Sequence, residues 1–121
     1  MFKNIVLIPL LITASSVLGN NKALSPALML RCAPCHGPDL NGVGGVFPSL
    51  MTSQLVKSGN LDGVIKFITH GSPADSQSLV KMPAKGGHLD LGDEEIREIA
   101  KQVIELARNY VEKKAPPTAS R

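Results

Sequence analysis

The segment RCAPCHGPDL, residues 31–40, holds both cysteines of this 121-residue chain, and a histidine follows the second of them. Cys32 and Cys35 are three positions apart, so they fall on one turn of a helix if the chain is helical here. Ser25 can begin such a helix, because serine followed by proline is typical of an N-cap and first helical position. We therefore expect a short helix that carries the cysteines at its end, with His36 directly after them.

Two irregular segments and two further helices are predicted downstream. Glycine recurs over residues 37–47 and a second irregular stretch covers residues 72–90. Between them, Asn60 can cap a helix of about two turns that Gly71 ends. The last helix starts with acidic residues at 93–95, and its apolar stripe comprises Ile96, Ile99, Ala100, Val103, Ala107, Tyr110 and Val111. Without an alternating strand pattern, the sequence predicts an all-α fold of about three to four helices with long loops.

Three kinds of site match the Cys-x-x-Cys-His pattern: a redox dithiol, half of a zinc site, and covalent haem attachment. A thioredoxin-like dithiol needs a βαβ context, and no strand pattern precedes Arg31. Zinc would need two more ligands, and the remaining histidines are only His70 and His88. Haem attachment explains the spacing, since two cysteines at a helix end can reach the two vinyl groups on one porphyrin edge while the next residue lies under the iron. Long loops also become reasonable if a cofactor organises them.

An electron-carrying haem iron needs a second axial ligand on its other face. Five side chains are candidates: Met29, Met51, Met82, His70 and His88. Met29 lies on the attachment helix, too close to reach the opposite face, and Met51 is compatible with ordinary packing. Met82 is far along the chain, in a loop, and its backbone is restricted by Pro83. We favour Met82, with the two histidines as alternatives.

With these motifs in order, the sequence resembles the class I c-type cytochromes, which include small bacterial monohaem proteins and cytochrome subunits of dehydrogenases. The resemblance covers nearly all of residues 24–106. It rests on the segments CAPCHG (32–37), GGVFPSL (44–50), KMPA (81–84) and LGDEEI (91–96).

The resemblance implies the cytochrome c fold and one covalently bound haem c. It implies thioether bonds at Cys32 and Cys35, with His36 as proximal and Met82 as distal iron ligand.

The segment GGVFPSL carries two further implied roles. The resemblance implies that the carbonyl of Pro48 accepts the other ring N–H of the proximal histidine, which orients a metal-bound imidazole. It also implies that Phe47 packs on the porphyrin.

The sequence departs from the family pattern at two places. The family usually crosses its first and last helices through a glycine and aromatic residues, whereas Leu24, Leu28 and Gln102 stand at the corresponding positions here. A looser or differently tilted crossing is therefore expected. Gly92 replaces the serine that commonly caps the last helix, so Asp93 or the backbone must cap it.

The ends of the chain predict export and a single domain. Lys3 precedes an apolar run over residues 5–18, which is shorter than the ~20 residues of a membrane-spanning helix and resembles a secretory signal peptide. We expect cleavage after Gly19, a cytochrome domain over residues 20–114 and a disordered tail over residues 115–121. The expected location is the periplasm, without stable membrane insertion, because no later segment could span a bilayer.

The expected activity is one-electron transfer without a substrate turned over by this chain. Residues 20–88 hold six Lys or Arg and three Asp, whereas residues 89–121 hold six Lys or Arg and seven Asp or Glu. Lys81 and Lys85 flank the ligand loop and are candidates for docking an acidic face of a redox partner, although scattered solvated lysines would look the same. This slight basic charge, without interleaved aromatic residues, gives no case for nucleic-acid binding.

Three functions are compatible with this reading. The favoured one is a monomeric periplasmic carrier in a respiratory chain that feeds a terminal oxidase or reductase. The second is a small cytochrome subunit of an exported dehydrogenase, beside its large subunit. The third is a haem-based gas sensor or peroxidase-like enzyme in which Met82 is not bound to iron.

Overall fold

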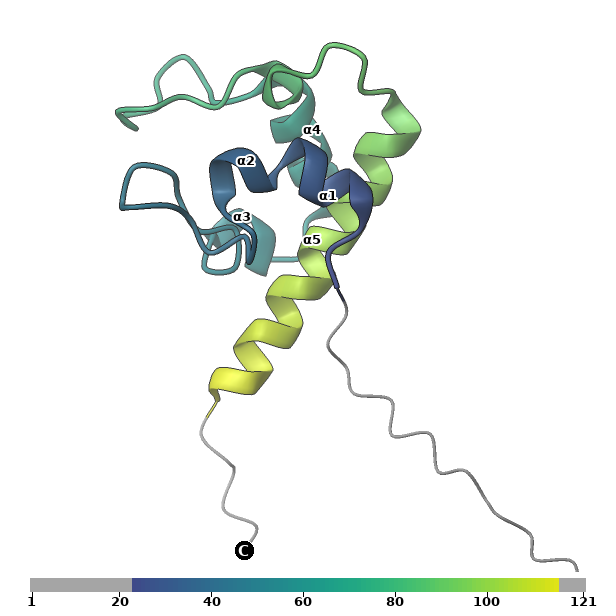
Figure 1. The fold of residues 1–121 in the computed structure, drawn as a ribbon. Coiled ribbons are helices and arrows are strands. Elements are labelled where there is room, and N and C mark those ends of the chain that lie inside the picture. The colour runs from purple at the N-terminus through teal and green to yellow at the C-terminus, as the bar shows by residue number, and fades with distance from the viewer. Residues whose placement is uncertain (1–22, 116–121) are drawn as a thin grey trace, which may run out of the picture.

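Helices joined by long loops make up residues 23–115, the part of the chain that the computed structural model describes (Figure 1). The elements are α1 (Pro26–Arg31), α2 (Ala33–His36), α3 (Gln54–Lys57), α4 (Leu61–His70), the 3-10 helix η1 (Ala84–Gly87) and α5 (Asp93–Lys114). Over the described residues, β structure is limited to an isolated bridge between Val43 and Phe47. The predicted all-α class is confirmed.

The three predicted helices begin where their capping residues place them. Ser25 Oγ accepts a hydrogen bond from the Leu28 N–H at 3.3 Å, and Asn60 Oδ1 accepts one from the Gly63 N–H at 3.0 Å. Helix α4 has ten residues and is longer than the two turns expected. Gly92 stands at the N-cap of α5, and only its backbone carbonyl contributes, accepting from the Ile96 N–H at 3.0 Å.

The sequence pattern did not predict two single-turn helices, α3 and η1. Helix α3 starts after Ser53, whose hydroxyl accepts from the Val56 N–H at 3.4 Å. That serine was the signal available for α3. A turn of four residues is too short for hydrophobic periodicity to show, so neither α3 nor η1 stood out from the surrounding loops.

Helix α5 is the centre of the packing, and α1, α3 and α4 all contact it (Figure 1). The buried core residues are Leu28, Leu40, Met51, Val56, Val64, Leu91, Ile96, Ile99, Ala100, Val103 and Ala107. The predicted stripe of α5 is thus buried from Ile96 to Ala107. Val111, at the end of the stripe, is 44% exposed because the last turns of α5 extend beyond the elements that cover its middle (Figure 1).

The crossing of α1 and α5 leaves space at the surface. A pocket of about 330 Å³ opens there, and Leu28 and Gln102 are among its lining residues. These are two of the positions at which the sequence departs from the family's aromatic crossing. Leu28 itself is fully buried, so the helices do pack, but they do not fill the crossing.

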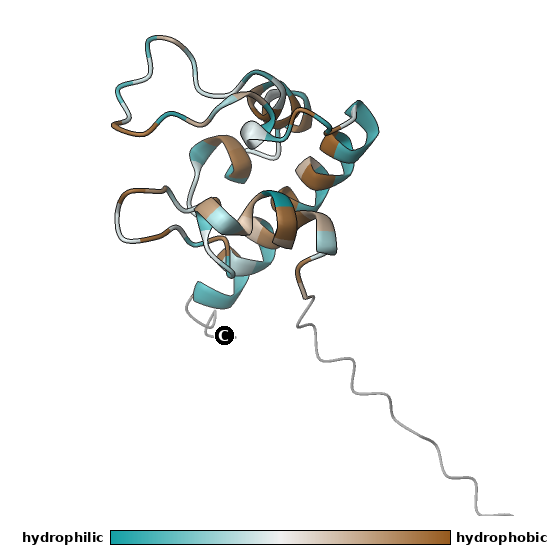
Figure 2. Cartoon of the chain, turned by 45° about the horizontal axis from the view of Figure 1, so that its top comes forward, coloured by the Kyte–Doolittle hydropathy of each residue, from teal (hydrophilic) through white to brown (hydrophobic). Residues whose placement is uncertain are grey.

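Two long loops extend to the same side of the molecule in Figures 1 and 2, with α2 between them in Figure 1. The first loop (residues 37–53) joins α2 to α3, and the second loop (residues 71–83) joins α4 to η1. Figure 2 shows hydrophobic residues on both loops. The Cys-x-x-Cys-His motif therefore lies between two partly apolar segments.

Two expectations concern the ends of the chain. The predicted signal peptide, residues 1–19, and the predicted tail from residue 116 onward lie outside the described residues. Of the helices that the structure describes, none has the length and apolar character needed to cross a membrane.

Candidate haem site

The Cys-x-x-Cys-His motif occupies the junction of α1 and α2. Cys32 ends α1, where its N–H donates to the Leu28 carbonyl at 3.0 Å. Its own carbonyl begins the next turn by accepting from the Cys35 N–H at 3.2 Å and from the His36 N–H at 2.9 Å. The two thiols and the imidazole are therefore carried by one helical turn, which is anchored through Leu28 to the core.

Both cysteines are free thiols. Cys32 is half-buried, and this burial, followed by the charge of neighbouring Cys35, raises the pKa of its thiol to about 11. A reactive redox dithiol needs the opposite, a thiol whose pKa is depressed. The described residues also gather no group of three or more His, Cys, Asp or Glu that could hold a metal ion, so the zinc alternative has no support among them.

His36 is oriented by the first loop. Its Nδ1 lies 2.9 Å from the Pro48 carbonyl oxygen, the contact that the family resemblance implies. A neutral imidazole that donates from Nδ1 keeps its lone pair on Nε2, so Nε2 is the atom available to iron.

The first loop folds back on itself to bring this carbonyl into place. The Gly42 N–H donates to the His36 carbonyl at 2.7 Å, and the Leu50 N–H donates to the Leu40 carbonyl at 2.8 Å. Gly42 has a φ of +88°, and a Cβ there would lie 2.5 Å from the Phe47 carbonyl oxygen. Glycine is thus required where the two arms of the loop meet.

Met82 lies in the second loop and is half-buried. A Cβ placed on Gly86 would lie 3.7 Å from Met82 Cε, 3.8 Å from the Arg31 carbonyl oxygen and 3.8 Å from His88 Cδ2. The candidate distal ligand and the residue before Cys32 therefore border the same glycine. His88 borders it too, whereas His70 is exposed at the end of α4.

An ion pair connects α1 to the segment before α5. The Arg31 guanidinium donates to both carboxylate oxygens of Asp90, at 3.0 and 2.8 Å, and its Nε lies 3.6 Å from Glu95 Oε1. The hydrogen bond from Arg31 is the main cause that holds the pKa of Asp90 below its ordinary value. Sequence spacing gave no sign of this pair, whose members are 59 positions apart.

Both candidate docking lysines make hydrogen bonds to backbone carbonyls. Lys81 Nζ donates to the Ala74 carbonyl at 2.7 Å and is exposed. Lys85 is half-buried, has a φ of +55° and donates to the Leu91 carbonyl at 2.7 Å. Lys81 is the more accessible of the two.

The surroundings of the motif fit a haem group. Four apolar side chains on the two loops are 40% or more exposed: Val43, Val46, Leu79 and Val80. Exposed apolar residues gathered on one side of a small protein are typical of a ligand-binding surface. The available donors are two thiols for vinyl groups, an oriented imidazole and a thioether, which is the set that a covalently bound haem uses. Cys32, Cys35, His36 and Met82 would hold it.

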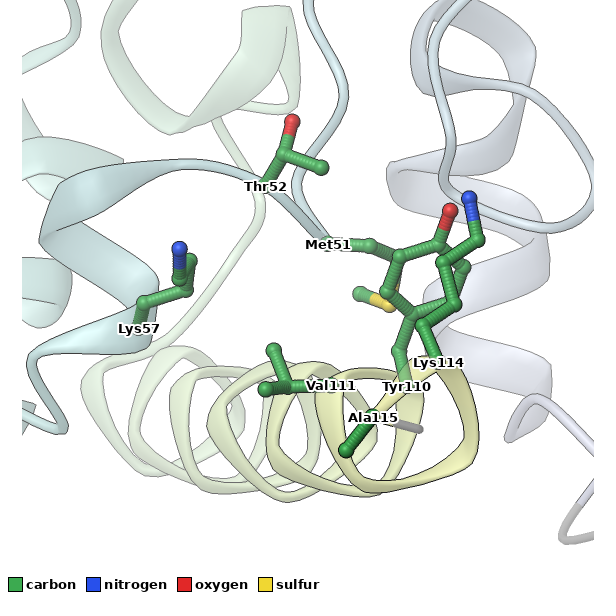
Figure 3. Close-up of a pocket in the computed structure, with 7 residues that line it drawn as sticks. All are labelled: Met51, Thr52, Lys57, Tyr110, Val111, Lys114 and Ala115. Atoms are coloured by element: carbon green, nitrogen blue, oxygen red, sulfur yellow. The ribbon is translucent and has the colours of Figure 1, made fainter. Parts of the chain in front are cut away.

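A second surface pocket lies on the far part of α5 and takes no part in this site (Figure 3). It has a volume of about 260 Å³, and Met51, Tyr110 and Lys114 are among its lining residues. Lys114 Nζ lies 5.0 Å from the centre of the Tyr110 ring. Hydrogen bonding by Lys114, and then by Asn41, lowers the pKa of Tyr110.

An all-α fold with a Cys-x-x-Cys-His turn and a Met-Pro loop at its side defines a class I c-type cytochrome, a haem c protein of electron transfer. The chain belongs to the family described as cytochrome c oxidase, cbb3-type, subunit III, whose model matches residues 28–101. Comparison with curated proteins and with solved structures gave no match. The predicted family is thus confirmed, and the matched range contains all the candidate site residues.

Proposed function

We propose that this chain is an exported one-electron carrier with a single haem c, attached through Cys32 and Cys35 and ligated by His36 and Met82. The observation that carries the proposal is the 2.9 Å contact from His36 Nδ1 to the Pro48 carbonyl, beside two free thiols on the same helical turn. Because Nδ1 donates to this carbonyl, Nε2 keeps its lone pair and is available as an iron ligand.

Attachment needs only the chemistry of the two thiols. Each S–H adds across a vinyl double bond, so the sulfur gains a carbon bond and the proton goes to the neighbouring carbon, without net oxidation. Free Cys32 and Cys35 are the reduced form that this addition needs.

Ligation by His36 and Met82 favours electron transfer over substrate chemistry. Haem c would supply one iron that can be ferric or ferrous. A thioether from Met82 favours the ferrous state, which raises the reduction potential relative to two histidines. His36 and Met82 would hold the iron without leaving a position for a substrate. Electrons would leave the haem at the surface of the two loops, where Val46 and Leu79 are exposed.

The deciding experiment compares the wild-type chain with Met82→Ala, both produced in a bacterium that exports and matures c-type cytochromes. We expect haem that stays on the chain through denaturation, and a weak near-infrared band from iron–sulfur bonding in the wild type that Met82→Ala loses. The reduced wild type should not bind carbon monoxide at neutral pH, and the variant should.

A wild type without the near-infrared band would contradict Met82 ligation. Two alternatives would then apply: His88 or His70 as ligand, or an open site that binds carbon monoxide and supports the sensor or peroxidase-like function. Haem lost on denaturation would contradict covalent attachment instead. The two parts of the proposal therefore fail separately.

The family match favours one second candidate, a cytochrome component of a larger oxidoreductase complex. The family's description names an oxidase subunit, and the corresponding sequence-based alternative is a small cytochrome subunit of an exported dehydrogenase. Purification of the tagged chain from its own host distinguishes the two. Stoichiometric recovery with a large subunit supports the complex, and recovery as a monomer supports a free periplasmic carrier between membrane redox partners such as a terminal oxidase or reductase.

Docking to an acidic partner is proposed to use Lys81, with half-buried Lys85 as a second cation. The ammonium of Lys81 is exposed on the second loop, next to apolar Val80. Because steering by exposed charge is screened by salt, the rate of electron transfer should fall as ionic strength rises. A rate that is independent of salt would contradict this docking mode.

A further inference from the structure

One residue of the second loop, Ser72, forms hydrogen bonds with both the N–H and the carbonyl of Met82. The Ser72 N–H donates to the Met82 carbonyl at 2.9 Å, and the Met82 N–H donates to Ser72 Oγ at 2.9 Å. One hydrogen bond from the backbone of Ser72 and one to its side chain therefore occupy both main-chain polar groups of Met82.

Gly71 makes this close approach possible. It ends α4 with a φ of +77° and is buried. A Cβ on Gly71 would overlap the Met82 carbonyl oxygen and would lie 2.7 Å from the Pro83 carbonyl carbon. Any side chain at Gly71 would push the Met82 segment away, so Gly71 and Ser72 together form a close backbone contact with it.

Gly71 and Ser72 are attached to a packed part of the molecule. Helix α4 directly precedes them, and Val64 buries α4 against α5. The intervening residues 73–80 are exposed except for half-buried Ser76, so this stretch has little packing of its own. Ser72 therefore transmits the position of α4 to Met82, and the exposed stretch does not.

We infer that Ser72 is a positioning residue for the Met82 thioether, through the hydrogen bond that its hydroxyl accepts from the Met82 N–H. The inference rests on the proposed ligation of iron by Met82. Without the hydroxyl, the backbone bond from Ser72 to Met82 remains, but the Met82 N–H has no acceptor and the loop gains freedom to move the sulfur off the iron.

The test measures how readily imidazole replaces Met82 in the ferric, haem-loaded protein. Ser72→Ala should bind imidazole roughly five- to tenfold more tightly than the wild type, since one hydrogen bond shifts an equilibrium by about that factor. Ser72→Thr keeps a hydroxyl and should return most of the way to the wild-type affinity. Ser78→Ala is the matched control, because Ser78 is an exposed serine of the same loop.

The outcomes separate this inference from the proposed function. A wild type without the iron–sulfur band would end the proposed ligation and the inference with it. A wild type with the band, but equal imidazole affinities in Ser72→Ala and wild type, would overturn the role of Ser72 alone. An equal gain in imidazole affinity in Ser72→Ala and Ser78→Ala would also overturn it. So would an imidazole affinity of Ser72→Thr as high as that of Ser72→Ala. A general loss of stability would lower the urea midpoints of Ser72→Ala and Ser72→Thr without a difference in imidazole affinity between the two variants, and that result would overturn the role of Ser72.

Discussion

His36 obtains its orientation from a carbonyl twelve residues further along the chain, that of Pro48. The His36 imidazole and the Pro48 carbonyl can meet only if the first loop reverses direction. That reversal depends on one residue, Gly42, whose N–H bonds to the His36 carbonyl and whose missing Cβ leaves room for the Phe47 carbonyl.

At the residue scale, we predict that Gly42→Ala disturbs the proximal side of the site. The left-handed backbone and the overlap with the Phe47 carbonyl should together lower the free energy of unfolding by about 2–3 kcal/mol. The measurement is urea unfolding of the haem-loaded protein, followed by haem absorbance. The yield of haem-loaded protein should fall as well, because the Pro48 carbonyl moves.

Gly45→Ala is the matched control. Gly45 belongs to the same loop and has a positive φ of +70°, but a Cβ there would meet nothing within 4 Å. It should cost about 1 kcal/mol from backbone strain alone. Equal losses in the two variants would show that the contact with Phe47 has no part in holding the loop.

At the element scale, the crossing of α1 and α5 positions the Cys-x-x-Cys-His turn on the core. Leu28 is fully buried in it, while Gln102 borders the pocket beside it. The departure from the family's aromatic crossing, seen in the sequence, therefore corresponds to space that the side chains leave unfilled.

We predict that Gln102→Phe stabilises the protein. An aromatic ring in the 330 Å³ pocket buries apolar surface without displacing Leu28, and filling a cavity of this kind typically contributes about 0.5–2 kcal/mol. Thermal unfolding of the haem-loaded protein measures it. Asn109→Phe, at an exposed position of the same helix, should give no gain. A destabilised Gln102→Phe would mean that the helices cannot accept a ring at this crossing.

At the scale of the whole molecule, Arg31 connects the first helix to the last part of the chain. It precedes Cys32 in sequence, and its partner Asp90 lies between the Met82 loop and α5. This pair therefore connects the segment that carries the Cys-x-x-Cys-His motif to the segment that follows Met82.

We predict that this pair makes stability fall in acid. Because hydrogen bonding to Arg31 lowers the pKa of Asp90 in the folded protein, its contribution is complete above the ordinary aspartate pKa of about 4. It is lost as pH falls through the folded value. Arg31→Gln should therefore be less stable than wild type at neutral pH, and the difference should shrink below about pH 4.

Urea midpoints between pH 7 and pH 3 measure this difference. Lys101→Gln is the control, because it removes a cation from an exposed i, i+3 pair with Glu98 within α5. A difference between wild type and Arg31→Gln that stays constant over this pH range would show that Asp90 is not its source.

The sequence was sufficient for features whose interactions lie within a few residues. Caps at Ser25 and Asn60 place α1 and α4, and the apolar stripe from Ile96 to Ala107 gives the buried face of α5. The attachment turn follows from the spacing of Cys32, Cys35 and His36. Single turns such as α3 were missed because four residues show no period.

What the sequence alone determined is the helical class, the Cys-x-x-Cys-His motif and the family, since each depends on local spacing or on a pattern of short motifs. Only the tertiary structure decided that Ser72 holds Met82, that Arg31 pairs with Asp90 and that the ammonium of Lys85 bonds to the Leu91 carbonyl. The physical reason is that a hydrogen bond acts over about 3 Å in space, whatever the separation along the chain. Which groups come within that distance depends on how the helices pack and on where the loops return.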